Sequence, residues 1–219
     1  VTPGTGIKET FSPTKTTGYT AEVDPEITSV TINYETQDDN VRSTSLLGDT
    51  GLTFTNNTVS DLKYGPNTVK VHIEAENGQP IDYEIVITRK MSNDALLNQI
   101  RVGYNGSTPT LIPGFNKTKD SYELSTKTNP LPYNTTSINI EYEKSHSEST
   151  VTGNIGSIDL TSYNDKELVP TGTNQFVYEY TFTINVDSQD KSNQKTYTLK
   201  MYKEANNSEE PNNMAYGAT

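Results

Sequence analysis

Hydrophobic and polar residues alternate along several stretches of the chain. Val30, Ile32 and Tyr34 are separated by polar residues, and Val69 to Ala75 continues the same pattern. The longest example lies in the second half, where apolar residues occupy Tyr178, Tyr180, Phe182, Ile184 and Val186. A period of two sustained over this length is typical of β-strands with one buried face.

Turn-forming residues interrupt these stretches about every ten residues, and helical periodicity is nearly absent. The pair Asn77-Gly78, for example, separates the stretch ending at Ala75 from one containing Tyr83, Ile85 and Ile87. Short Thr-, Val-, Ile- and Tyr-rich segments between such turns favour an all-β sandwich or barrel.

The segments fall into two matching sets. Phe11 and Tyr19 correspond to Phe115 and Tyr122, residues 29–35 resemble residues 137–143, and residues 69–89 resemble residues 178–203. A duplicated domain with loop insertions produces this arrangement. We therefore predict two tandem β-sandwich domains at residues 1–90 and 91–204, joined by a short linker at about Lys90 to Asn93 and followed by a polar C-terminal tail at residues 205–219.

The first copy lacks apolar residues ahead of its Phe landmark. Leu96, Leu97, Ile100, Val102 and Leu111 precede Phe115 and should form the opening strand of the second domain, whereas only Ile7 precedes Phe11. We expect an open sheet edge in the first domain, which invites pairing with another segment. Our hypothesis for the tail (residues 204–219) is that it packs against a neighbouring molecule, at that edge, through Met214 and Tyr216.

The motifs together resemble the bacterial cadherin-like β-sandwich repeat. The opening of this repeat is matched in the second copy by Leu111, Pro113, Gly114, Phe115 and Tyr122. Its closing hairpin is matched in the first copy by Val71, Ala75, Glu76, Asn77, Gly78, Tyr83, Ile85, Ile87 and Arg89. The second closing hairpin departs from the pattern at residues 187–193. The resemblance implies two immunoglobulin-like antiparallel sandwiches from a secreted or wall-attached bacterial protein, with no catalytic residues.

Composition narrows the classes of function. The formal net charge of −11 disfavours a nucleic-acid or anionic-lipid partner, because the phosphate interaction would be repulsive. The chain has no cysteine, so disulfides and thiolate zinc sites are excluded. No apolar run reaches the length of a membrane span. The 14 tyrosines predict tyrosine-rich cores.

Candidate chemistry is sparse. We expect His72 to be a solvated residue on a polar strand face and His146 to lie in a polar loop, without the motif of a nucleophile elbow. The acidic clusters Asp38-Asp39-Asn40 and Asp187 with Asp190 lack the spacing of a calcium loop. Their side chains are better explained as caps on turn amides. We predict no catalytic, cofactor-binding or metal site, and no enzymatic activity.

The sequence therefore favours a non-catalytic spacer or adhesive module of a bacterial protein, located outside the cell or in the cell wall. Its expected partners are other modules of the same parent chain, surface glycans or host proteins. The alternative is a carbohydrate-binding module accessory to an enzyme elsewhere in the parent chain, with tyrosine rings stacking on sugars. An exposed cluster of coplanar tyrosine rings would distinguish this alternative from the spacer.

Overall fold

The computed structural model describes residues 1–172 and 175–205, and these form strands, turns and loops without any helix. The chain divides into two compact units, Val1–Ser92 and a second unit from Asn93 on. The all-β immunoglobulin-like sandwich class predicted from the alternation is confirmed. No helix able to cross a membrane occurs in the described part of the chain.

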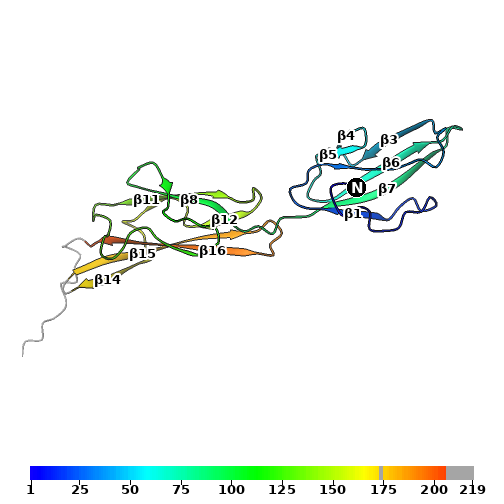
Figure 1. Ribbon diagram of the computed structural model, residues 1–219. Helices are drawn as coiled ribbons and strands as arrows, with labels where there is room; N and C mark the ends of the chain where they lie inside the picture. Colours follow the sequence, from blue (N-terminus) through cyan, green and yellow to red (C-terminus); the bar gives the residue numbers. More distant parts are fainter. Residues whose placement is uncertain (173–174, 206–219) are drawn as a thin grey trace, which may run out of the picture. The chain divides into compact units, whose positions relative to one another are not determined.

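In the first unit, a four-stranded sheet faces a three-stranded sheet (Figure 1). The larger sheet has the order β1 (Tyr19–Val23), β7 (Pro80–Arg89), β6 (Gly65–Glu74) and β3 (Ser43–Gly48), and the smaller has the order β2 (Val30–Thr31), β5 (Thr58–Ser60) and β4 (Thr53–Thr55). The strands of the smaller sheet are only two or three residues long. The larger sheet therefore supplies most of the backbone pairing in this unit.

The second unit has two larger layers. One has the order β10 (Ser121–Glu123), β16 (Gln194–Glu204), β15 (Gln175–Asp187) and β12 (Thr150–Gly153), with β14 (Lys166–Gly172) also paired to β15. The other has the order β13 (Gly156–Asp159), β11 (Ser137–Lys144), β8 (Leu97–Tyr104) and β9 (Thr110–Leu111). Leu111 thus lies in β9 and is exposed, whereas Leu97, Ile100 and Val102 of β8 are buried.

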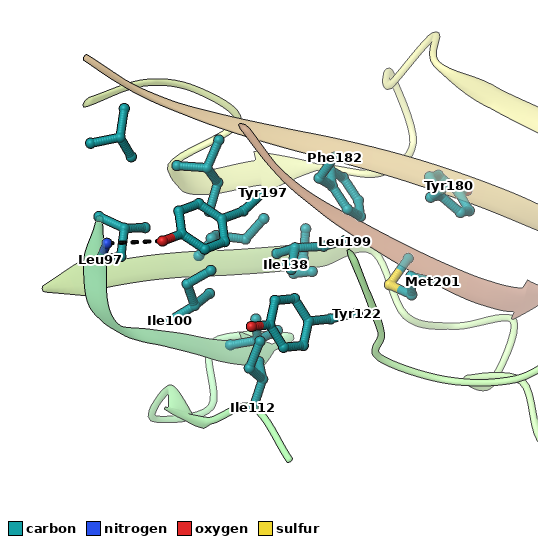
Figure 2. Packing of buried hydrophobic residues seen from close by; sticks show 14 of the residues in the cluster. Leu97, Ile100, Ile112, Tyr122, Ile138, Tyr180, Phe182, Tyr197, Leu199 and Met201 are labelled. Atoms are coloured by element: carbon teal, nitrogen blue, oxygen red, sulfur yellow. Dashed lines mark hydrogen bonds between the residues drawn. The ribbon is translucent and has the colours of Figure 1, made fainter. Parts of the chain in front are cut away.

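Each unit has its own core, built by the alternating stretches. In the first unit the core includes Tyr19, Ile32, Val69, Val71 and Ile87. The second core includes Tyr122, Tyr180, Phe182, Tyr197 and Leu199, so tyrosines contribute to both, as their number predicted. Figure 2 shows β8 residues Leu97 and Ile100 packed close to Tyr197 in the second core.

Most strand pairs are antiparallel, with one parallel pair in each unit. β1 runs parallel to β7, and β10 runs parallel to β16. In both units an early strand is therefore hydrogen-bonded alongside the last strand. The predicted turn at Asn77-Gly78 joins β6 to β7, and Gly78 there has a φ of 78°, a conformation that glycine adopts without a Cβ penalty.

Candidate functional site

The two histidines lie in different units and contact different side chains. His72 lies on the outward side of β6, but it is half-buried, and its Nδ1 is 2.6 Å from Asp82 Oδ1 on β7. The expectation of a merely solvated histidine thus missed a cross-strand partner, which only the register between β6 and β7 reveals. His146 lies in a loop, where its Nε2 is 3.3 Å from Gln189 Oε1. These contacts hold loops and strands in place.

In each acidic cluster, one aspartate accepts a hydrogen bond from a backbone amide. Asp38 Oδ1 accepts hydrogen bonds from the Asn40 N–H and side-chain amide at 2.9 and 3.1 Å. Asp190 accepts from the Ser188 hydroxyl and the Ser192 N–H, which lowers the pKa of its carboxyl. No group of three or more His, Asp or Glu side chains able to hold a metal ion occurs within residues 1–172 and 175–205.

Most tyrosine rings pack inward. Tyr163, Tyr178 and Tyr180 form contacts with one another and with Phe182, with Tyr163 and Phe182 ring centroids 5.1 Å apart. Among the described tyrosines, Tyr133 is prominently exposed, at 59%. The rings that the sequence offered for sugar stacking are therefore mostly engaged in the protein's own packing.

Both units contain the same aromatic corner, which we define as a Phe, a Tyr on the parallel strand and a Tyr on the last strand. Phe11 stacks on Tyr19 at 5.7 Å and contacts Tyr83 at 5.4 Å. The Tyr19 hydroxyl reaches the carbonyl oxygens of Ser12 and Lys15 at 3.0 and 2.9 Å. These bonds tie the loop before β1 to the sheet.

The corner of the second unit repeats this geometry. Phe115 stacks on Tyr122 at 5.6 Å and contacts Tyr197 at 6.3 Å. The Tyr122 hydroxyl reaches the carbonyl oxygens of Asn116 and Lys119 at 2.5 and 3.3 Å. The residue pairs matched from sequence, Phe11 with Phe115 and Tyr19 with Tyr122, thus have the same partners in the fold.

The parallel pair is longer in the first unit. Five residue pairs join β1 to β7, from Tyr19↔Ile85 to Val23↔Arg89. Three join β10 to β16, and a separate bridge links Leu131 to Lys203. We call these the terminal strand pairs.

An apolar groove of about 940 Å³ lies between the sheets of the first unit. Ile32 and Tyr34 line it from one side, and Ile73, Ile81 and Tyr83 line it from β6 and β7. Phe11 and Ile81 are lining residues that stay 54% and 37% exposed. Large apolar side chains left this open on a small domain are typical of a contact surface.

The segment that follows β2, residues 32–35, lies beside this groove, is extended and has few backbone hydrogen bonds. Its side chains keep the alternation past the end of β2, with Ile32 buried, Asn33 and Glu35 exposed, and Tyr34 half-buried. The Thr31 N–H donates to the Thr2 carbonyl at 2.7 Å, whereas the Ile32 N–H donates to Asn57 on the other side at 2.8 Å. By this alternation the amides of Asn33 and Glu35 face the same side as Thr2. Within the described residues no backbone hydrogen bond reaches them.

The carboxylates whose pKa values are lowered do not line the groove. Hydrogen bonds from Thr20 lower the pKa of Glu9, and the Lys8 ammonium lowers that of Glu22. In the second unit a hydrogen bond from Lys200, 2.8 Å away, lowers the pKa of Glu179. Burial raises the pKa of Tyr104 to about 12 and also raises that of Tyr197. Each shift follows from a hydrogen bond, an ion pair or burial within its own unit.

Comparison with solved structures returned distant likenesses. One is a crystal form of protocadherin gamma B7 extracellular cadherin domains 1–4, with 9% identity and a TM-score of 0.27 over 84% of this chain and 48% of that chain. The present chain therefore spans about half the length of that structure. Another comprises fibronectin(III)-like modules of CbhA from Clostridium thermocellum, with 12% identity and a TM-score of 0.24 over 90% of this chain and 93% of that chain.

No curated protein matches the sequence. The model of one family, the cadherin-like beta sandwich domain, matches residues 2–90. This range coincides with the first compact unit, which carries an aromatic corner, a closing hairpin and a sandwich core of its own. The cadherin-like part of the resemblance inferred from the sequence is thereby confirmed for residues 2–90, which match the cadherin-like beta sandwich domain.

Proposed function

We propose that the chain is a non-catalytic, load-bearing module of a bacterial extracellular or wall-attached protein, used for spacing or adhesion. The family matched by residues 2–90 supports this, because cadherin-like domains are in general extracellular. We further propose that the second unit is another copy of the same domain. Its support is the repeated aromatic corner and the repeated terminal strand pair.

The terminal strand pair carries the proposal. When opposite ends of a unit are pulled, two parallel neighbours slide along each other, so their hydrogen bonds are loaded together rather than one after another. In the first unit these bonds alternate along β1, since the Thr20 and Glu22 amides donate to Glu9 and Thr5 on the other side. The Ala21 amide therefore faces β7, opposite Ile87.

Single-molecule force spectroscopy on the full chain tests this function. We expect two abrupt unfolding events, each lengthening the chain by about 3.6 Å per released residue. Ala21→Pro removes an amide inside the terminal strand pair and should lower the force of the event assigned to the first unit. Glu22→Pro is the matched control, because its amide bonds only the Thr5 hydroxyl.

Comparing Ala21→Pro with Glu22→Pro distinguishes a specific effect on the terminal strand pair from a general loss of stability. Equal loss of force in both would show that the terminal strand pair is not the resisting element. Extension of the wild-type chain without any abrupt event would contradict a load-bearing role. The alternative of carbohydrate binding is checked by glycan-array binding of the same protein, where a positive result would redirect the assignment.

A further inference from the structure

We infer that β3, the edge strand of the larger sheet in the first unit, is a self-association site at which two copies of this chain pair antiparallel. β3 comes last in the order β1, β7, β6 and β3, so it has β6 as a neighbour on one side and an open edge on the other (Figure 1). This inference is independent of the mechanical function proposed above. It concerns an internal strand of the first unit and the same strand of a second copy.

The backbone groups at this edge follow from the ladder between β3 and β6. Directly after β3, the Asp49 N–H donates to the Thr68 carbonyl at 3.0 Å. Bonded pairs alternate with non-bonded pairs in an antiparallel ladder, so every second residue counted back from Asp49 also faces β6. The N–H and C=O groups of Thr44, Leu46 and Gly48 therefore point away from the sheet. In the part of the chain that the structure describes, no hydrogen bond reaches them.

β3 lacks the features that usually protect a sheet edge. Natural edge strands carry charged residues, proline or a bulge, or are very short. β3 has six residues, none of them charged and none of them proline, and its register with β6 continues without a shift. On its outer face the Leu47 side chain is 47% exposed. An edge of this kind accepts another strand through backbone hydrogen bonds.

Opposite charges at the two ends of β3 indicate that the added strand is a second copy of β3. Arg42 directly precedes the strand, and Asp49 directly follows it. In an antiparallel pair the cation of each copy lies at the anionic end of the other, whereas a parallel pair would bring like charges together. Arg42 Nη1 is 3.1 Å from Glu74 Oε1, yet the Arg42 side chain is 66% exposed and can also reach a second copy.

The open backbone groups determine the register of the pair. When Leu46 lies opposite Leu46 of the second copy, Thr44 lies opposite Gly48 at both ends. Each of these pairs exchanges two hydrogen bonds, so every open amide and carbonyl of both edges finds a partner. A shift by two residues in either direction would leave one of these groups without its partner. A two-fold axis relates the two strands, and the assembly therefore closes at a dimer.

This register also places the side chains favourably. Ser43 lies opposite Asp49 of the second copy, so the neighbouring Arg42 comes close to that carboxylate. Leu47 lies diagonal to Leu47 of the second copy on the outer face, within reach of a long side chain. The dimer thus covers an exposed apolar side chain and forms two ion pairs that the monomer does not have.

The second unit does not offer an equivalent edge. β12 holds the corresponding place beside β15, but it has only four residues, and β14 covers the adjoining stretch of β15. The residues directly before and after β12, Ser149 and Asn154, are uncharged. Two copies of β12 therefore lack the charge complementarity of β3, and we assign self-association to the first unit.

Sedimentation equilibrium of the full chain at about 0.15 M salt, which screens the repulsion between two chains of net charge −11, tests the inference. The pairing surface is small, so we expect a monomer–dimer equilibrium with a Kd between about 10 µM and 1 mM. Hydrogen exchange at Thr44, Leu46 and Gly48 should slow as the protein concentration rises. A chain that stays monomeric up to about 1 mM, or that forms larger assemblies, would overturn the inference.

A pair of variants at one position tests the backbone pairing. Thr44→Pro removes an outward amide and leaves the hydrogen bonds to β6 in place, so the unit should fold while dimerisation weakens at least about tenfold. Thr44→Ala keeps the amide and should dimerise like the wild-type chain. Equal dimerisation of the two variants would show that β3 is not the interface.

Charge reversal tests the choice of partner and the antiparallel direction. Arg42→Glu and Asp49→Lys each bring like charges together in a dimer of identical copies, and each should weaken self-association at least about tenfold. An equal mixture of the two variants should recover the dimer, because each end of the mixed pair then has one cation and one anion. This recovery also shows that both variants are folded.

Two results of these experiments would count against the second copy as the partner. A mixture that associates no better than either charge variant alone would rule out antiparallel pairing of β3 with itself. Slow hydrogen exchange at Thr44, Leu46 and Gly48 that does not depend on protein concentration would assign the edge to another segment of the same chain. Either result would overturn the inference.

Discussion

β11 and the segment from Val30 to Thr36 carry similar patterns but have different neighbours. In β11, Ile138 and Ile140 are buried, and the strand runs for eight residues between β13 and β8. In the first unit, Val30 and Ile32 are equally buried, yet β2 ends at Thr31. The comparison shows that alternation places side chains on faces, whereas the length of a strand depends on whether a neighbour pairs with it.

The same comparison extends to the corner tyrosine on the last strand of each unit. Tyr197 has no exposure and bonds both Leu97 and Lys117, whereas Tyr83 is only partly buried and donates to the Pro13 carbonyl. One added strand thus changes a tyrosine from a rim residue into a core residue. The following predictions test how much stability β8 supplies to the second unit and how the first unit differs from it.

The largest effect is expected for Ile100→Asp in β8. Burying a carboxylate at a position with no exposure should cost on the order of 4 kcal/mol or more and unfold the second unit selectively. Arg101→Ala, on the exposed face of the same strand, should change stability by less than about 0.5 kcal/mol. Urea unfolding followed by hydrogen exchange of each unit makes the measurement. A second unit that keeps its stability in the Ile100→Asp variant would show that β8 is dispensable.

A smaller difference should separate the two corner tyrosines. Tyr197→Phe leaves the Leu97 amide and the Lys117 carbonyl without their buried partner and should cost about 1–3 kcal/mol. Tyr83→Phe removes one hydrogen bond, to the Pro13 carbonyl, at a partly buried site and should cost less than about 1 kcal/mol. Equal losses in denaturant titrations would mean that β8 does not change the environment of this tyrosine.

Acid should weaken the second unit partly through Glu179. Its pKa is lowered in the folded state by Lys200, so the ionised form contributes stability above the unfolded pKa of about 4.3. That contribution is lost as the pH falls through the folded pKa. Because the pair is partly solvated, we expect less than about 1 kcal/mol. Glu179→Gln should flatten the dependence of unfolding free energy on pH below this value, while Glu143→Gln serves as a surface control.

The smallest expected effect is that of calcium. A site filled to a hundred times its dissociation constant adds about 2.7 kcal/mol, which corresponds to a rise of several degrees in Tm. Asp38 and Asp190 already cap backbone amides in their respective units. We therefore expect the same melting curves in EDTA and in millimolar calcium. A rise confined to one unit, located by Asp38→Asn or Asp190→Asn, would contradict this expectation and reveal a difference between the units.

Several features of the fold could be predicted from local pattern. The alternation at Val69 to Ala75 and at Tyr178 to Val186 indicated strands with one buried face, and Val69, Val71, Phe182 and Ile184 are indeed buried. The match of Phe11 and Tyr19 to Phe115 and Tyr122 anticipated the paired aromatic corners. The proposed role of Met214 and Tyr216 lies outside the described residues.

Other features depended on which strands became neighbours. Neither the parallel direction of β1 against β7 nor the pairing of His72 with Asp82 has a signal in the local sequence, because both arise from the register between distant segments. The sequence also suggested an open edge from the few apolar residues before Phe11, but not the apolar groove beside it. A period of two assigns side chains to faces of a strand, and only tertiary packing decides which strand lies next to which and how far each face is covered.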